Sequence, residues 1–299
     1  MSFFSVFIFL ILFRSVLSQE YLPANVIQLP SHIKAVVVSK SHQKLLIVKI
    51  EDGKPVIVDQ MIAVTGLRFG DKIKKGDMRT PSGVYFPVSF KPGKTLPSYY
   101  GKGAFPLNYP NALDRHILRR DGDGIWLHGS PKKELLFFSS KGCVILKDKD
   151  LKRLSDYILL KKTPVVIQER FFNLSYREYI NLRKKALDFI NRWKKAVLKI
   201  YAGDVFDIYD LYSPEFNSKY GTRYDLINHY KKLFHSYGGN KPFVKIINKM
   251  VLYDVREDNK EFFVVFFQMG FLSGDEIKTL KKVLYISAND MKVITEENF

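Results

Sequence analysis

The 299-residue sequence contains a single cysteine, Cys143, and few acidic residues compared with basic ones. One cysteine excludes an intrachain disulfide framework and leaves too few thiols for a cysteine-based zinc site. Acidic residues number 30 against 48 lysines and arginines, so the formal net charge is +18. Hydrophobic residues still make up 46%, which is enough for ordinary cores and argues against disorder. The sequence therefore predicts a basic, folded protein with room for two domains.

The opening stretch, MSFFSVFIFLILFRSVLSQE, is interpreted as a secretory signal. Its apolar run, Phe3–Phe13, has the length of a signal core and is too short to span a bilayer. Val16 and Ser18 are small residues ahead of an expected cleavage site near Gln19, so residues 1–19 would be removed. The stretch before the apolar run has no Lys or Arg, which leaves an uncleaved membrane anchor as the alternative. Either interpretation predicts an exported protein, in contact with the membrane only if the signal stays uncleaved.

Export gives the lone cysteine an unusual setting. In an oxidising compartment cysteines usually occur as disulfide pairs, and Cys143 has no partner within the chain. It is therefore a buried structural thiol, an intermolecular link or a reactive nucleophile. Its surroundings in the sequence have to decide between these three.

Up to about residue 173 the sequence is dominated by strand-like runs. These runs are β-branched or aromatic, short, and separated by Gly, Pro, Asp and Lys turns. They read IKAVVVSK, QKLLIVKI, PVIVDQMIAV, SGVYFPVSF and TPVVIQ. One helix is expected over residues 148–162, with Asp148 as its N-cap and Thr163–Pro164 as its stop. This half is predicted to be a mostly β domain with the thiol just before its helix.

After residue 173 the pattern becomes helical and then strand-like again. A long helix is expected from about residue 176, with apolar residues on one face at helical spacing. These are Tyr179, Leu182, Ala186, Ile190, Trp193, Val197 and Ile200. A second helix should begin after an N-cap at Thr222 and stop at Gly238–Gly239. Four strand-like runs follow, so this half is predicted to be an α+β domain.

His128 lies fifteen positions before Cys143, at the end of a short apolar strand, and is followed by glycine. A thiol nucleophile needs a nearby base, and the base needs a partner that orients its other ring nitrogen. Gly142 allows the backbone to approach a substrate closely, and the N–H groups of Gly142 and Cys143 are candidate oxyanion donors. The spacing thus favours a thiol enzyme over a structural thiol.

Three motifs around these residues resemble one known family. HG followed by SKGCV is similar to the H-G…S-x-G-C-[IV] signature of the L,D-transpeptidase (YkuD-type) domain. KKGDMRTPSGVYF is similar to that family's G-D-x-x-T-P-x-G-x-[FY] segment, and FPLNYPNALDR resembles the branch with the cell-shape L,D-carboxypeptidases and YafK-like enzymes. The resemblance covers residues 33–169 and leaves residues 20–32 as an expected linker. It implies a YkuD-type β-sandwich with a helix after the nucleophile.

The resemblance also implies a role for each matching residue. Cys143 would be the nucleophile, His128 the general base and later the acid, and Gly129 the source of the carbonyl that orients the imidazole. The acyl site and its oxyanion donors would be formed by Ser140, Lys141 and Gly142. The remaining histidines show no metal-ligand spacing, so neither a metal nor another cofactor is expected.

The implied substrate is a peptidoglycan stem peptide. The family attacks the carbonyl at the L-centre of a diamino acid, expels D-alanine, and resolves the thioacyl enzyme with water or with an amine. Two departures favour water: Lys141 stands where many transpeptidases have His, and Ile145 where they have Arg or Asn. We therefore expect a periplasmic L,D-carboxypeptidase that converts tetrapeptide to tripeptide stems. An L,D-transpeptidase and a non-catalytic wall-binding scaffold are the alternatives.

Residues 175–299 resemble an NTF2-like domain, which implies helices packed on a curved antiparallel sheet. Such a module follows the YkuD-type domain in the cell-shape carboxypeptidases, and its pocket would take a protein or glycan ligand. Without a catalytic constellation of its own, it should be dispensable for chemistry, so residues 1–173 alone are expected to act on small stems. The basic charge also suits nucleic acid, but export and the lack of a binding motif argue against that partner.

Overall fold

The computed structural model describes residues 21–201, 203–235, 245–256, 258–273 and 276–298. The expected signal peptide, residues 1–19, and the Gly238–Gly239 helix stop lie outside the described residues. In the part of the chain that is described, no helix has the length and apolar character needed to cross a bilayer.

Five strands of the N-terminal half form one sheet in the order β5-β4-β3-β11-β6. They are β3 (Ala35–Ser39), β4 (Lys44–Glu51), β5 (Lys54–Ile62), β6 (Gly83–Tyr85) and β11 (Val165–Gln168). All five coincide with the predicted strand-like runs, and none extends beyond its run by more than one residue. Val36 and Val38 of β3 pack into one core while Ala35 and Val37 pack into another. Both faces are covered at the central strands β3 and β11, where every residue is buried, which explains why these two strands are mostly apolar instead of alternating.

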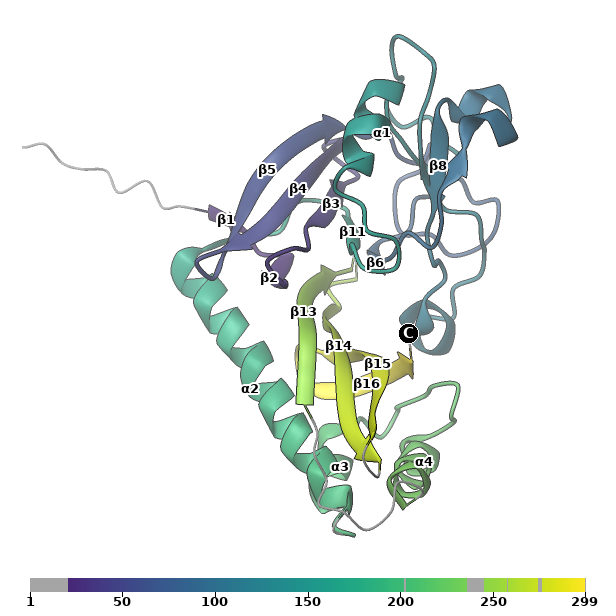
Figure 1. The fold of residues 1–299 in the computed structure, drawn as a ribbon. Coiled ribbons are helices and arrows are strands. Elements are labelled where there is room, and N and C mark those ends of the chain that lie inside the picture. Colours follow the sequence, from purple (N-terminus) through teal and green to yellow (C-terminus); the bar gives the residue numbers. More distant parts are fainter. Residues whose placement is uncertain (1–20, 202, 236–244, 257, 274–275, 299) are drawn as a thin grey trace, which may run out of the picture.

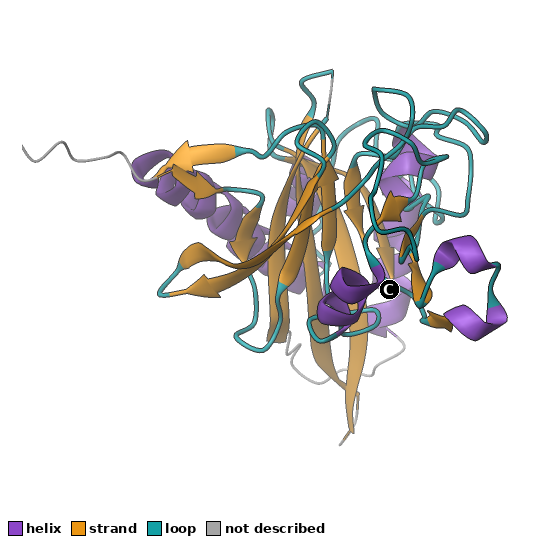
Figure 2. Cartoon of the chain, turned by 90° about the horizontal axis from the view of Figure 1, so that it is seen from above, coloured by secondary structure: helices purple, strands orange, loops and turns teal. Residues whose placement is uncertain are grey.

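A smaller four-stranded sheet, in the order β10-β9-β8-β7, packs over one face of this sheet and carries the predicted site. Its strands are β7 (Lys91–Pro92), β8 (Gly103–Pro106), β9 (Trp126–His128) and β10 (Val144–Ile145). Two 3-10 turns and a π-helical turn connect its parts, at Gly93–Thr95, Ser98–Tyr100 and Leu113–Ile117. The N-terminal half is thus mostly β, in agreement with the predicted sandwich (Figure 2).

The helix after the cysteine is shorter than predicted. Helix α1 spans Asp148–Ser155, and Asp148 is its first residue instead of its N-cap. The Asp148 carboxylate accepts a hydrogen bond from the Lys102 N–H at 2.8 Å, so it ties α1 to the neighbouring sheet. Beyond the helix, Thr163 Oγ1 accepts from the Leu159 N–H and donates to the Tyr157 carbonyl, which holds residues 157–163 in a turn. These side-chain bonds replace the helical ones that periodicity alone would favour.

The C-terminal half follows the predicted order of helices and then strands (Figure 1). The helices are α2 (Tyr176–Tyr201), α3 (Phe206–Leu211) and α4 (Arg223–His235), and the strands are β13 (Lys245–Val255), β14 (Glu261–Ser273), β15 (Glu276–Ser287) and β16 (Lys292–Asn298). The four strands form an antiparallel meander. One face of this sheet packs against the apolar face of α2, including Trp193 and Val197, as predicted. Thr222 and Asp225 exchange capping bonds at the start of α4, which confirms Thr222 as its cap.

The expected linker, residues 20–32, is part of the fold from residue 21 onward. Strand β1 (Tyr21–Pro23) pairs with β12 (Asn173–Ser175), and β2 (Val26–Gln28) pairs with β13 as the fifth strand of the C-terminal sheet. The two halves of the chain therefore interlock through the segment that precedes the catalytic motifs.

The two halves also share a hydrophobic core. Val37 and Val48 from the N-terminal sheet pack in one cluster with Leu252, Val264 and Val283 from the C-terminal sheet. Separating the halves would expose both apolar faces to water, which costs about 25 cal/mol for each Å². The expectation that residues 1–173 act alone is therefore not supported by this packing.

Candidate active site

Cys143 lies in the short turn just before β10, where its side chain is partly buried. Gly142 precedes it with φ = 126°, a conformation that L side chains rarely adopt. A Cβ atom at this position would lie 2.8 Å from the Arg79 carbonyl oxygen. Glycine is required here for two reasons, the backbone angle and the close approach of the Arg79 segment, and it fixes where the thiol emerges.

His128 is the last residue of β9, and its side chain is almost completely buried. Its Nδ1 lies 2.7 Å from the Gly129 carbonyl oxygen. A carbonyl oxygen can only accept, so Nδ1 carries the proton and the lone pair of the neutral ring is on Nε2. The predicted orienting bond from His128 to the Gly129 carbonyl is present, and it leaves Nε2 able to accept a proton.

Strand pairing brings the thiol and the imidazole to the same face of the small sheet. Strands β9 and β10 are parallel, with Ile145 opposite His128 and Val144 opposite Leu127. Cys143 precedes Ile145 by two residues, so its side chain has the same orientation as those of Ile145 and His128. In ideal strand geometry, with a strand spacing of ~4.8 Å and a rise of ~3.3 Å per residue, these positions correspond to about 8 Å between the Cα atoms of Cys143 and His128. Side chains of this length can meet across that distance.

Burial keeps both groups neutral at rest. Desolvation raises the pKa of the Cys143 thiol, against hydrogen bonding from the Trp126 backbone and the charge of Lys72. Desolvation lowers the pKa of His128, and its bond to Gly129 only partly opposes this. A neutral thiol beside a neutral imidazole is the protonation state from which a base-assisted attack can start.

Three residues that the sequence did not single out also surround the pair. The Tyr100 ring contacts the His128 ring edge-on, with 4.8 Å between centroids, and it packs on Trp126 at 5.0 Å. Lys72 is buried and binds Asp77 at 2.7 Å, and its charge acts on Cys143. The aromatic run PSYYGKG was the available signal for Tyr100, but nothing in the sequence shows which ring faces the histidine.

The three predicted acyl-site residues differ in their hydrogen bonding and their exposure. Ser140 Oγ donates to the Cys143 carbonyl at 2.6 Å and accepts from the Gly142 N–H at 3.0 Å, so it braces the turn from within. Lys141 is exposed. Since the Gly142 N–H is already engaged, the expected pair of oxyanion donors reduces to the Cys143 N–H in this segment. Ser140 is a bracing residue and Gly142 a conformational one.

The TPSG motif supports the cysteine turn indirectly, through the segment around Gly66. Thr80 Oγ1 accepts a hydrogen bond from the Gly66 N–H at 2.8 Å, and the backbone on either side of Gly66 bonds with Ser140. The resemblance identified this motif, but its physical function becomes visible only in the structure. The motif holds the strand-like segment 64–67 against the turn that presents the thiol.

A buried arginine connects this motif to the C-terminal half. Arg256, just after β13, binds the Asp254 carboxylate at 2.9 Å and Asp71 at 3.3 Å, and it lies 3.5 Å from Asp114. It also donates to the carbonyl oxygen of Ser82 in the TPSG motif. One cation from the second half therefore neutralises carboxylates of the first half, and it does so beside the TPSG motif.

Comparisons with known proteins agree with this arrangement. Residues 33–167 match the L,D-transpeptidase catalytic domain, YkuD. The fold is similar to the structure of Bdellovibrio bacteriovorus Bd1075, with 26% identity, a TM-score of 0.76, and coverage of 93% of this chain and 98% of that one. It is also similar to the helical cell shape determining protein Pgp2 from Campylobacter jejuni, with 21% identity, a TM-score of 0.72, and coverage of 92% and 95%. No curated protein sequence matches the chain.

The family match covers the residues that carry the site. Both Cys143 and His128 lie inside the matched range, as does the TPSG motif at residues 80–83. The similarity to Pgp2, at 21% identity, concerns the fold alone. Residues 33–167 of this chain match the L,D-transpeptidase catalytic domain family, YkuD, in agreement with the resemblance seen in the sequence.

Proposed function

We propose that this chain is an exported thiol peptidase that acts on peptidoglycan stem peptides, as an L,D-carboxypeptidase that trims tetrapeptides to tripeptides. The observation that carries the proposal is the pairing of β9 with β10, which sets His128 opposite Ile145, two residues after Cys143, while the Gly129 carbonyl fixes the imidazole ring. The match of residues 33–167 to the YkuD family supports the chemistry. The similarity in fold to Pgp2, a helical cell shape determining protein, supports an effect on cell shape.

The reaction would proceed in two halves. Nε2 of neutral His128 accepts the thiol proton as the Cys143 sulfur attacks the carbonyl carbon at the L-centre of the diamino acid. The C–N bond to D-alanine breaks, and the imidazolium gives its proton to the departing amine. A water molecule, deprotonated by His128, then attacks the thioester, and the sulfur leaves and regains its proton. The Cys143 N–H would stabilise the oxyanion in both halves.

Trimming is preferred to cross-linking because of one side chain on the site's own face. Ile145 is opposite His128 in the β9–β10 pair, and it exchanges two backbone bonds of 2.8 Å with Val64. An apolar side chain at that point offers no hydrogen bond or charge to a second stem. A loss of about 1.4 kcal/mol in acceptor binding changes the partition between water and amine tenfold.

For the second half, we propose an NTF2-like domain over residues 175–299, completed by strand β2. Helices α2 and α4 on one face of an antiparallel sheet support this proposal. A protein or glycan would be its ligand. We place the enzyme in the periplasm on the strength of the signal-like residues 1–19.

Product analysis separates the candidate activities. We expect wild-type enzyme to convert a purified tetrapeptide stem mainly to tripeptide and D-alanine, even with excess acceptor stem. The measurement is mass spectrometry of the products with and without acceptor. Mostly dimer joined between two diamino-acid residues would establish a transpeptidase instead, and no mass change with folded, reduced protein would favour a scaffold.

The pH dependence of kcat/KM should reflect the burial of His128. The base must be neutral, and burial lowers its pKa from 6.5, so activity should fall on acidification with a midpoint below pH 6.5. His116 also has a lowered pKa, because of desolvation and the neighbouring arginines, but it lies outside the site. His116→Gln is therefore the control, and its acid limb should coincide with that of the wild type. A wild-type midpoint at or above 6.5 would contradict a desolvated base.

A further inference from the structure

Four large apolar side chains are exposed on two segments beside the cysteine turn, residues 66–70 and 131–141. These side chains are Leu67, Phe69, Leu136 and Phe137. Their exposed fractions lie between 48% and 78%. A single exposed apolar residue is common on protein surfaces, whereas a group of them indicates a contact surface. We call these four residues the apolar patch.

The two segments are held side by side by hydrogen bonds and by one ring contact. The Ser140 N–H donates to the Thr65 carbonyl at 3.1 Å. The side-chain oxygen of buried Gln43 accepts from the Thr65 N–H at 3.1 Å and from the Phe138 N–H at 3.0 Å. The Phe138 ring packs on Phe69 with 4.9 Å between centroids. The apolar patch therefore lies on a fixed backbone, with its side chains held in water.

The exposed charges of these two segments are mostly basic. The exposed cations are Arg68, Lys132, Lys133 and Lys141. Within residues 66–70 and 131–141, all of which are described, Glu134 is the one exposed carboxylate. Lysine is depleted at protein–protein interfaces, whereas apolar side chains flanked by Lys and Arg bind anionic lipid surfaces. The composition therefore favours a lipid surface over a protein partner.

We propose that the apolar patch and its flanking cations dock the protein on an anionic phospholipid surface. The apolar side chains would enter the boundary between headgroups and acyl chains, and the cations would lie among the lipid phosphates. Ser140, whose hydroxyl donates to the Cys143 carbonyl, belongs to one of the two segments, so docking would hold the thiol site at the membrane. The proposal rests on this surface and does not depend on the reaction at Cys143.

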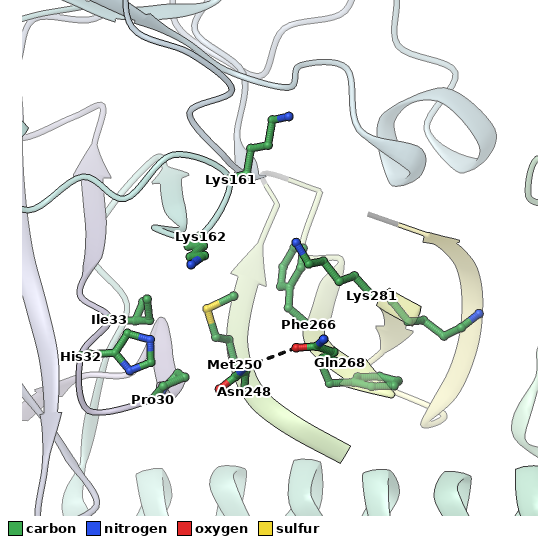
Figure 3. Close-up of a pocket in the computed structure, with 12 residues that line it drawn as sticks. Pro30, His32, Ile33, Lys161, Lys162, Asn248, Met250, Phe266, Gln268 and Lys281 are labelled. Carbon is green, nitrogen blue, oxygen red and sulfur yellow. Dashed lines mark hydrogen bonds between the residues drawn. The ribbon is translucent and has the colours of Figure 1, made fainter. Parts of the chain in front are cut away.

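A basic cavity elsewhere in the molecule offers a different place for a lipid phosphate. It has a volume of about 230 Å³ and is lined by Met250 of β13 and Phe266 of β14, among others (Figure 3). Lys162 and Lys281 also line it, and both are exposed. Such a cavity can hold one headgroup, but it cannot insert side chains into a bilayer. Its two lysines therefore provide the control for charge.

The test is amide hydrogen exchange in residues 66–70 and 131–141 of the exported, purified protein as the lipid concentration increases. The vesicles contain phosphatidylcholine alone, or equal parts of phosphatidylcholine and phosphatidylglycerol. We expect both segments to be protected on the anionic vesicles, and much less on the neutral ones. The measured quantity is the lipid concentration that gives half of the maximal protection. This local measurement is valid whether or not the N-terminal segment is cleaved.

Phe69→Ser combined with Leu136→Ser should raise this lipid concentration at least tenfold, because one such side chain contributes roughly tenfold when it leaves water. The matched control is Phe206→Ser with Leu160→Ser, which changes the same residue types at exposed positions on α3 and in the turn before Thr163. This control pair should behave as wild type. Circular dichroism checks that each variant is folded.

Lys132→Gln combined with Lys133→Gln should raise the lipid concentration at least fivefold, because one lysine near an anionic surface contributes roughly fivefold. Its control is Lys162→Gln with Lys281→Gln, which removes the same charge from the cavity and should have a much smaller effect. An equal effect would overturn the proposal and place the lipid phosphate in the cavity.

Three further results would overturn the proposal. They are unchanged exchange in both segments on anionic vesicles, equal protection on the two kinds of vesicle, and an equal loss in the Phe206 and Leu160 control. The sedimentation coefficient of the Phe69 and Leu136 variant is measured without lipid. A lower oligomeric state than wild type, with unchanged protection on vesicles, would assign the apolar patch to contact with a second copy of the chain instead.

Discussion

Replacing Cys143 by alanine is expected to abolish the release of D-alanine from tetrapeptide stems. The substitution removes the atom that forms the thioacyl bond, and losses of roughly 10⁴-fold or more follow when a nucleophile acting with its base is deleted. Cys143→Ser should be nearly as inactive, because a hydroxyl is far less ionised than a thiol at the same pH. The measurement is kcat/KM for D-alanine release from a purified stem.

Stability is the necessary control for both variants. Cys143 is partly exposed, and its thiol donates a long hydrogen bond of 3.4 Å to the Gly124 carbonyl, so its removal should cost little folding free energy. Circular dichroism and the urea midpoint should therefore remain close to the wild-type values. Ser140→Ala offers a comparison within the same turn, since it removes a bracing hydroxyl and keeps the thiol. A folded Cys143→Ala protein with wild-type turnover would end the thiol mechanism.

Replacing Arg256 by methionine should be the most destabilising single change outside the hydrophobic cores. It would leave the carboxylates of Asp71, Asp114 and Asp254 buried without their shared cation. Burial raises the pKa of Asp114 to about 6 even with the arginine present, which shows how costly its charge is there. Removing one partner of a buried ion network costs about 3–5 kcal/mol. The measurement is the free energy of unfolding in urea.

The matched control for this change is Arg153→Met. Arg153 also contacts two carboxylates, Asp59 at 3.1 Å and Asp150 at 3.4 Å, but its side chain is 47% exposed. Exposed pairs contribute about 0–1 kcal/mol, so this variant should be close to wild type. Equal effects of Arg153→Met and Arg256→Met would contradict a structural role for the buried network.

We also expect one cooperative unfolding transition for the whole chain, because the two halves share a hydrophobic core.

Much of the fold could be predicted from periodicity and composition. The β-branched runs gave five strands of the first sheet, and the apolar spacing from Tyr179 to Ile200 gave the buried face of α2. These signals arise within a single strand or helix, so they can be recognised without knowing which other element packs against it. The pairing of β2 with β13 is not local, and a three-residue strand has too few positions to show a pattern. For that reason residues 20–32 look like a linker in the sequence.

The site was predictable where the motif and the chemistry coincide. Cys143 and His128 follow from the needs of a thiol nucleophile, and the family resemblance implied the role of Gly129. The structure shows the hydrogen bond between the His128 ring and the Gly129 carbonyl. Contacts between distant segments were not predictable. The binding of the Gly142 N–H by Ser140, and the reach of Arg256 to Ser82, depend on side-chain directions that only the folded chain defines.

The central claim is that Cys143 becomes acylated by a stem peptide. The most direct measurement is intact-protein mass spectrometry after rapid acid quench of wild-type enzyme mixed with tetrapeptide stem, followed by digestion to locate the adduct. We predict an added mass equal to the stem without its terminal D-alanine, carried on Cys143 and absent from Cys143→Ala. Release of D-alanine by Cys143→Ala, or an adduct on any other residue, would contradict the account.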